Sequence, residues 1–314
     1  MSCATCQRIY YDCIYDFHKQ NEESIVFLRN HGVLPTDVIC PRCRSECVYI
    51  KEEHLWQCRS YTDAESRKRQ QCDYSVSDFK GSFLDNARIP PWKVVLFVNE
   101  FLNQTWSDMI LMAKQEMCLR AQEWRSFCCG VTENWLHKQE QIGGESIEVE
   151  IGEALIVHRK PDRGPILNQV WLFGGLERTS KRHFVVPLID KERDKATLVP
   201  LIQTFIKPGS VIYSDTGAAY SDLSSLGYHH YVINHSENSD QTHIHTQNIE
   251  HLWRKIKWSM RRLSSTGSKC FHQYLARYLF ISSEKDKSVL HHKFFREAAQ
   301  LYVPLSDQPC PSTT

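Results

Sequence analysis

The hydrophobic pattern of this chain changes its period at Gly143-Gly144, and this change constrains the fold more than any other feature. From Trp92 to about Lys138 the apolar residues recur at helical spacing, and Pro90-Pro91 is a plausible helix start. After the glycine pair the apolar residues alternate, as in strands. The pattern then predicts strands at 147–158, 168–177 and 183–190, a helix at 192–206, strands at 211–215 and 230–234, and helices at 247–263 and 268–283.

The order of these elements predicts an α/β fold. Three hairpin-connected strands followed by alternating helix and strand is the order of an RNase H-like core. The cysteine-bearing and helical regions upstream predict a small zinc ribbon and a helix-turn-helix-like region before it. We therefore expect five segments: a helical lead-in at 1–38, a zinc ribbon at 39–84, a helical DNA-binding-type region at 88–140, the RNase H-like domain at 146–284, and a C-terminal helix with a disordered tail at 285–314.

Length, composition and charge exclude several classes of protein. The 314 residues suffice for two or three domains, and 41% hydrophobic with 24% charged residues is globular composition. No apolar run approaches the ~18 residues of a membrane span, and the N-terminus does not have the pattern of a secretion signal. We expect a soluble nuclear or cytoplasmic protein. Its net charge of +1 requires that any phosphate affinity come from local patches.

Four cysteines predict a structural metal site. Thirteen cysteines without a secretion signal indicate reduced thiols rather than disulfides. Cys40 and Cys43 form a CxxC pair, and Cys58 with Cys72 completes the four thiolates of a closed tetrahedral zinc site. The second pair is split by 13 residues, so Cys47 is the rival fourth ligand. The alternative is that some of these are buried thiols without metal.

Two further patterns in the first half of the chain are less specific. Cys3 and Cys6 form another CxxC, with Cys13 nearby, but no second pair of cysteines lies close in sequence. The helical region between residues 92 and 137 interleaves tryptophans with cations, which would suit a helix-turn-helix. A helical bundle with a tryptophan core explains that region equally well. The four tryptophans are Trp92, Trp106, Trp124 and Trp135.

Two acidic residues stand where phosphoryl-transfer chemistry could use them. Asp215 ends the apolar strand VIYSD, and Glu250 lies in a predicted helix with an apolar stripe. Glu250 shares one helix face with Arg254, Lys257 and Arg261, within about 60° of one another. That face is either an exposed salt-bridge ladder or a metal-binding carboxylate next to a phosphate track.

The chain resembles a known family of DNA-modifying enzymes. The segments VEIGEA, RGPILNQVWLFGGLER, TLVPLIQTFIKPGSVIYSD, INHSEN and HTQNIEHLWRKIK are similar, in order and spacing, to the catalytic domain of DDE transposases of the Merlin superfamily and their bacterial insertion-sequence relatives. The cysteine region, KGSFL at 80–84 and the helices before residue 142 resemble the zinc ribbon and helical DNA-binding region of those proteins. The resemblance covers about residues 25–283.

This resemblance implies three carboxylates that bind two divalent metals, and one of them is absent. The second acid maps to Asp215 and the third to Glu250, but the first falls on Gly152 within VEIGEA. Glu150 shares the strand face about 6.6 Å away, and Glu153 points to the other face. The family also tends to have tryptophan where this chain has Gly217, which weakens the local support of Asp215.

The leading hypothesis is therefore a transposase-derived DNA-binding protein, degenerate or domesticated, that has lost metal-dependent strand cleavage and transfer. Arg254, Lys257, Arg261 and Arg262 are its expected DNA contacts on the acidic helix. The alternatives are an active transposase with Glu150 or Glu153 as a displaced acid, and a zinc-ribbon protein-interaction module. Zinc is the expected structural cofactor, and Mg²⁺ or Mn²⁺ is expected only in an active enzyme. DNA, including terminal inverted repeats, and a second copy of the chain are the partners that the resemblance allows.

Overall fold

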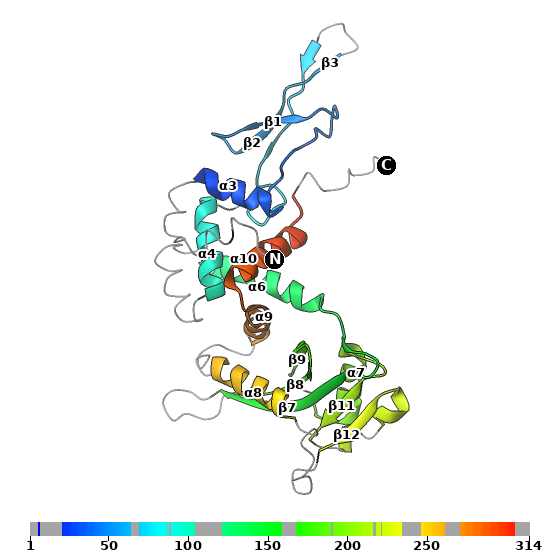
Figure 1. Cartoon of the computed structure of the whole chain (residues 1–314). Coiled ribbons are helices and arrows are strands. Elements are labelled where there is room, and N and C mark those ends of the chain that lie inside the picture. Colours follow the sequence, from blue (N-terminus) through cyan, green and yellow to red (C-terminus); the bar gives the residue numbers. More distant parts are fainter. Residues whose placement is uncertain are drawn as a thin grey trace. The chain divides into compact units, whose positions relative to one another are not determined.

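A computed structural model of the chain forms two compact units (Figure 1). One unit comprises residues 138–272, and the other combines residues 1–137 with 273–314. The structure describes residues 6, 21–63, 69–85, 87, 89–103, 121–158, 168–189, 191–215, 218–220, 222–233, 246–260 and 271–304. Among these, no helix combines the length and the apolar character needed to cross a membrane.

The unit formed by residues 138–272 is built on a five-stranded sheet with the order β12-β11-β7-β8-β9. Strands β7 (Glu148–His158), β8 (Asn168–Glu177) and β9 (His183–Leu188) are antiparallel neighbours. Strands β11 (Val211–Ser214) and β12 (His229–Val232) run parallel to β7. The predicted strands are confirmed, with ends that differ by a few residues.

The two faces of this sheet carry different helices. Val149 and Ile151 of β7 belong to an apolar core with residues of α7 (Lys195–Phe205), which begins at the N-cap Asp194. The opposite face of β7 packs against α8 (Gln247–Met260). The predicted apolar stripe of α8 is buried as far as the structure describes it, at Ile249, Leu252, Trp253, Ile256 and Met260. Alternation along β7 therefore decides which side chains face α8.

Smaller elements complete this unit. Strand β6 (Ile142–Gly143) pairs in parallel with β10 (Ile206–Lys207), beyond the end of α7. Two 3₁₀ turns, η2 (Ala218–Tyr220) and η3 (Leu223–Leu226), follow β11 and add Tyr220 and Leu223 to the core on the α7 side.

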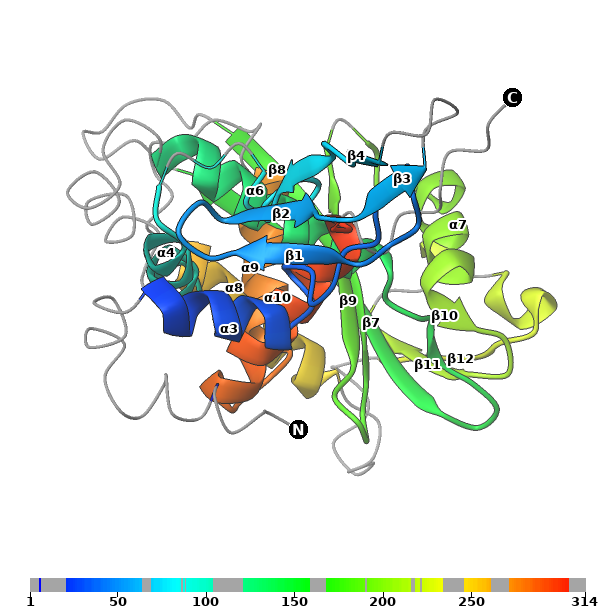
Figure 2. The same ribbon diagram turned by 90° about the horizontal axis from the view of Figure 1, so that it is seen from above.

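The other unit contains a small antiparallel sheet with the order β1-β2-β5. Figure 2 labels two of its strands, β1 and β2. Its strands are β1 (Cys47–Ile50), β2 (Leu55–Cys58) and β5 (Ser75–Ser77). The segment between β2 and β5 folds into a hairpin of β3 (Tyr61–Asp63) and β4 (Arg69–Gln71). Strand β2 ends at Cys58, one of the predicted metal ligands.

The helices that the structure describes in this unit are α3 (Asn21–Asn30), α4 (Pro91–Asn103), α6 (Ala121–His137), α9 (Phe271–Ser282) and α10 (Lys287–Leu301). Trp124 and Trp135 of α6 are buried, and Trp135 meets Phe280 of α9 edge to face with ring centroids 5.1 Å apart. These two tryptophans are core residues. Trp106, and the tail predicted to be disordered after residue 304, lie outside the described residues.

Candidate functional site

The candidate site lies where β7 and β11 run side by side beneath the start of α8. The parallel register pairs Val211 with Glu148 and Tyr213 with Glu150. Continued by two residues, the same register puts Asp215 opposite Gly152. Because side chains alternate along a strand, Glu148, Glu150 and Gly152 all face α8. Gly152 therefore presents no side chain at the position next to Asp215.

Local geometry does not require glycine at position 152. Gly152 pairs regularly with Gly174 of β8, so it is not part of a bulge. A Cβ atom at Gly152 would lie 3.4 Å from Nε1 of Trp253 and 3.6 Å from Cγ2 of Ile249, which are ordinary contacts. At Gly174 a Cβ atom would approach the carbonyl oxygen of Phe184 to 2.6 Å and Trp253 to 2.8 Å. Close packing demands glycine at position 174 but not at 152.

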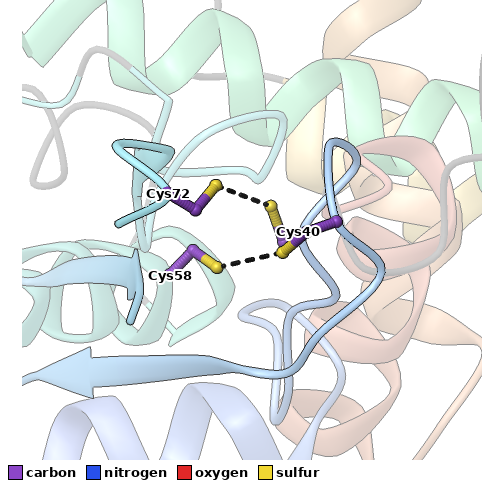
Figure 3. Close-up of side chains that lie close together, drawn as sticks. Cys40, Cys58 and Cys72 are labelled. Carbon is purple, nitrogen blue, oxygen red and sulfur yellow. Dashed lines mark hydrogen bonds between the residues drawn. The ribbon is translucent and has the colours of Figure 1, made fainter. Parts of the chain in front are cut away.

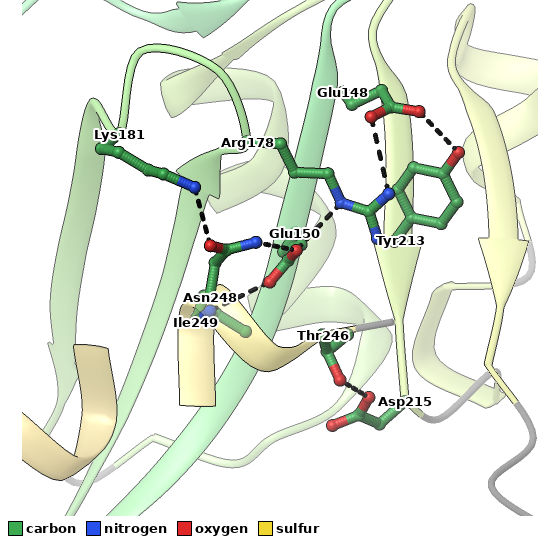
Figure 4. Close-up of polar contacts among 9 residues, drawn as sticks. All are labelled: Glu148, Glu150, Arg178, Lys181, Tyr213, Asp215, Thr246, Asn248 and Ile249. Carbon is green, nitrogen blue, oxygen red and sulfur yellow. Dashed lines mark hydrogen bonds and ion pairs between the residues drawn. The ribbon is translucent and has the colours of Figure 1, made fainter. Parts of the chain in front are cut away.

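The carboxylate of Glu150 is fully buried and holds the first residues of α8 in place (Figure 4). Its Oε1 accepts hydrogen bonds from Nε of Arg178 at 2.9 Å and Nδ2 of Asn248 at 2.7 Å. Its Oε2 accepts from the backbone N–H of Ile249 at 2.9 Å. Glu150 is 0% exposed. Both oxygens thus bond to groups that position the helix start, where the helix dipole favours a negative charge.

A polar network surrounds this buried carboxylate (Figure 4). Nζ of Lys181 donates to Oδ1 of Asn248 at 2.7 Å, and the guanidinium of Arg178 lies 3.9 Å above the ring of Tyr213. The hydroxyl of Tyr213 donates to Oε1 of Glu148 at 3.0 Å. Burial, reinforced by this hydrogen bond to Glu148, raises the pKa of Tyr213, so Tyr213 is a neutral donor at pH 7.

Asp215 is held at the N-terminal end of α8 by Thr246. The Thr246 hydroxyl donates to Oδ1 of Asp215, and the backbone N–H of Glu250 donates to the Thr246 carbonyl at 3.1 Å. Glu250 therefore lies one helical turn after Thr246. Glu250 is exposed. The structure therefore brings Asp215, Gly152 and the first turn of α8 together.

Glu153 projects to the opposite face of β7. Its Oε1 accepts from the hydroxyl of Tyr220 at 2.9 Å, and its Oε2 lies 3.1 Å from Nη1 of Arg193. Tyr220 belongs to the core on the α7 side of the sheet. The carboxylate of Glu153 is thus committed to Tyr220 and Arg193.

The cations predicted to contact DNA are only partly within the described residues. Arg254 and Lys257 are exposed on α8, away from its buried stripe. Arg261 and Arg262 lie outside the described residues, as does Gly217.

Four cysteine sulfurs converge beside the small sheet (Figure 3). The Sγ atoms of Cys40, Cys43, Cys58 and Cys72 all lie within 4.8 Å of one another. The Sγ atoms of Cys40 and Cys72 are 3.7 Å apart, and those of Cys43 and Cys58 are 3.3 Å apart. Tetrahedral Zn–S bonds of about 2.3 Å would separate the sulfurs by roughly 3.8 Å. This donor set fits a zinc ion in a closed structural site.

The hairpin β3–β4 explains how a long insert can join two ligands of one cluster. The backbone N–H of Cys72 donates to the Ser60 carbonyl at 2.8 Å, and that of Cys58 donates to the Tyr74 carbonyl at 2.9 Å. The chain leaves the cluster after Cys58 and returns at Cys72. Cys47, the rival ligand, lies outside the group of four, and burial raises its pKa to about 11.

Sequence reasoning missed the residues that hold Glu150 and Asp215. Arg178, Asn248 and Thr246 form this support. Only Thr246 had a local signal, because threonine directly before a helix is a favoured N-cap type. Arg178 and Asn248 reach Glu150 across 28 and 98 residues of sequence, a distance that no local pattern encodes.

Comparisons with known proteins indicate a similarity to transposases and transposase-like proteins. Residues 141–280 match the family model described as ISXO2-like transposase domain. An uncharacterized transposase-like protein from Haemophilus influenzae is 31% identical over 80 residues, which are 26% of this chain and 65% of that protein. The chain thus spans just under two thirds of that relative's length. These similarities support a relationship to transposases.

Proposed function

We propose that the protein is a transposase-derived DNA-binding protein that has lost metal-dependent DNA strand cleavage and transfer. Its similarity to transposases supports the origin, and the glycine at position 152 supports the loss. The protein would keep the RNase H-like core of DDE transposases, with motifs that resemble those of the Merlin superfamily. The sheet order, with three antiparallel strands beside two parallel ones, is consistent with that core.

The observation that carries this proposal is the position of Gly152 next to Asp215. Phosphoryl transfer of this type uses two divalent metals, which clamp the attacking and leaving oxygens between converging carboxylates. In this chain Asp215 and Glu250 would be the remaining acids. Gly152 offers no side-chain oxygen at the point between β7 and β11 where a third acid would complete the set. A bare pair of acids should bind such metals weakly.

Neither neighbouring glutamate is placed to replace the missing acid. The oxygens of Glu150 are bonded to Arg178, Asn248 and Ile249, so turning toward a metal would break a buried ion pair and uncap α8. Glu153 lies on the other face of the sheet with Tyr220. These contacts weigh against an active transposase with a displaced acid.

The decisive variant is Gly152→Asp, because a Cβ atom at this position makes only ordinary contacts. We expect Gly152→Asp to bind Mn²⁺ about tenfold more tightly than the wild type or more, a gain of roughly 1.4 kcal/mol. Titration calorimetry of the full chain measures this directly. Gly152→Asn, which has the same shape without the charge, is the matched control and should bind like the wild type. Asp215→Ala in the Gly152→Asp background should reverse the gain.

A nuclease assay tests directly whether the protein has lost DNA strand cleavage and transfer. The wild type, incubated with Mg²⁺ or Mn²⁺ and DNA carrying Merlin-type terminal repeats, is expected to leave the strands intact. Cleavage or joining by the wild type, abolished by Asp215→Ala, would overturn the proposed loss of activity. If Glu150→Gln or Glu153→Gln removed that activity without unfolding the protein, the displaced-acid alternative would be correct.

The four-cysteine cluster would serve as a zinc ribbon within the DNA-binding region. The ion would be held by four cysteines, Cys40, Cys43, Cys58 and Cys72. Its role would be structural, because protein ligands fill all four of its coordination positions. A zinc-ribbon module that binds only proteins is the competing possibility. Its signature would be DNA binding that is absent or insensitive to salt.

A further inference from the structure

A second cluster of metal-ligating side chains joins three distant parts of the unit formed by residues 1–137 and 273–314. Sγ of Cys6 lies 3.1 Å from Nε2 of His31, and Nδ1 of His292 lies 3.0 Å from the same Nε2 atom. All three donor atoms lie within 4.8 Å of one another. His31 directly follows α3, and His292 belongs to α10. Neither the proposed function nor the four-cysteine site involves these residues.

The orientation of His31 presents a lone pair to its two neighbours. Its Nδ1 lies 2.7 Å from the carbonyl oxygen of Phe27, which can only accept a hydrogen bond. Nδ1 must therefore carry the proton, and in the neutral ring Nε2 has a single lone pair. A carbonyl bonded to the far nitrogen is the usual arrangement that orients a metal-binding histidine.

Two groups approach this one lone pair, which a shared cation explains better than hydrogen bonds. The Cys6 thiol and the His292 ring cannot both donate well to the same Nε2 atom. A cation between the three donors would satisfy all of them at once. Tetrahedral zinc bonds of about 2.0–2.3 Å separate neighbouring nitrogen and sulfur ligands by roughly 3.3–3.6 Å, slightly more than the distances between these atoms.

The three donor side chains are largely shielded from water. Cys6 and His31 are fully buried, and His292 is half-buried. The ring centroid of Phe27 lies 4.1 Å from that of His31, and the Phe295 ring lies 6.0 Å away. These aromatic rings exclude water on one side of the cluster, which strengthens bonds to a cation. The charge of Arg296 also acts on His31 and His292.

We propose that Cys6, His31 and His292 bind a second structural Zn²⁺ ion. One thiolate and two imidazoles are a borderline-soft donor set that zinc prefers over magnesium or calcium. The ion would link the N-terminal segment to α3 and α10, across 25 and 261 residues of sequence. Cys3, the CxxC partner of Cys6 in the sequence, lies outside the described residues.

The test is the number of zinc ions per purified full-length chain. Mass spectrometry gives the zinc concentration, which is divided by the protein concentration. We expect two zinc ions in the wild type and one in His292→Ala. His137→Ala is the matched control, because His137 is an exposed histidine at the end of α6, and it should retain two. The zinc content of Cys40→Ser should also fall to one, because this variant loses the ion of the four-cysteine site.

Cobalt substitution distinguishes the two sites without relying on one variant. In the double variant Cys40→Ser, Cys43→Ser, bound Co²⁺ should show a single thiolate charge-transfer band, and adding Cys6→Ala should remove it. Circular dichroism verifies that each variant is folded. A wild type with one zinc ion, which Cys40→Ser removes, would overturn the proposal. So would a folded His292→Ala that keeps two ions.

Discussion

Gly152 and Gly174 pair with each other across β7 and β8, yet their surroundings differ. At Gly174 the obstacle to a side chain is the backbone carbonyl of Phe184, which cannot move without disturbing β9. At Gly152 the nearest atoms are the side chains of Trp253 and Ile249 at contact distance. Close packing thus requires glycine at position 174 but not at position 152.

Alanine substitutions should separate these two roles. Gly152→Ala is expected to leave the free energy of unfolding unchanged or to raise it by up to about 1 kcal/mol, because alanine loses less backbone entropy on folding. Gly174→Ala should lower the free energy of unfolding by roughly 1–3 kcal/mol through overpacking. Urea unfolding of both variants measures the difference. Equal destabilisation would mean that Gly152 is also required by packing.

Glu150 and Glu153 should also differ in what they stabilise. Glu150→Gln leaves the buried guanidinium of Arg178 without its charge partner, which should cost about 3–5 kcal/mol of unfolding free energy. Glu153→Gln is the matched control, because its partner Arg193 is 44% exposed and the pair should contribute about 1 kcal/mol or less. Thermal unfolding compares the two. A stable Glu150→Gln variant would contradict the structural role of this carboxylate.

At the scale of single elements, α8 connects the candidate site to the surface. Its buried stripe packs on the sheet, its first residues bind Glu150, and Thr246 just before it binds Asp215. Arg254 and Lys257 lie on its exposed side. The start of this helix therefore holds Asp215, and its exposed side carries the cations proposed to contact DNA.

Charge reversal on α8 should weaken DNA binding in a salt-dependent way. The double variant Arg254→Glu, Lys257→Glu is expected to reduce the slope of log affinity against log salt by about 0.9 for each phosphate that the variant no longer neutralises. Lys207→Glu, at an exposed position of β10, is the control and should change the slope little. Fluorescence anisotropy over a series of salt concentrations gives both slopes. An unchanged slope in the double variant would exclude α8 as the DNA-binding surface.

At the scale of the whole molecule, the two units should respond differently to metal removal. Both cysteine-containing clusters belong to the unit formed by residues 1–137 and 273–314. The five-stranded sheet belongs to the other unit, whose core is apolar. Binding of structural zinc contributes to the free energy of folding, so its removal should destabilise the unit that binds it.

Hydrogen exchange after chelation tests this division. With a zinc chelator, amides at 39–78 should lose protection, while amides of β7, β8 and β11 should keep theirs. Adding zinc back should restore the original protection, which controls for irreversible damage. Equal loss of protection in both units would mean that their stability is coupled.

Local pattern was sufficient to predict most elements of the sheet and its helices. Alternation predicted β7, β8 and β9, and helical spacing predicted the buried stripe of α8, because each depends on neighbours within a few turns or strand residues. The identity of Asp215 and Glu250 as candidates also came from sequence, since one ends a strand and the other opens a helix. These predictions required no knowledge of distant contacts.

The sequence by itself determined the order of the elements, the candidate acids and the four-cysteine set with one rival. Only the tertiary structure decided that Cys72 rather than Cys47 joins that set and that Glu150 bonds to the start of α8. It also set the register of β7 and β11, which, continued by two residues, puts Asp215 opposite Gly152. The convergence of Cys6, His31 and His292 is of the same kind. The physical reason is that these facts depend on strand register and on contacts across tens to hundreds of residues, whereas periodicity reports only on which face of an element a side chain occupies.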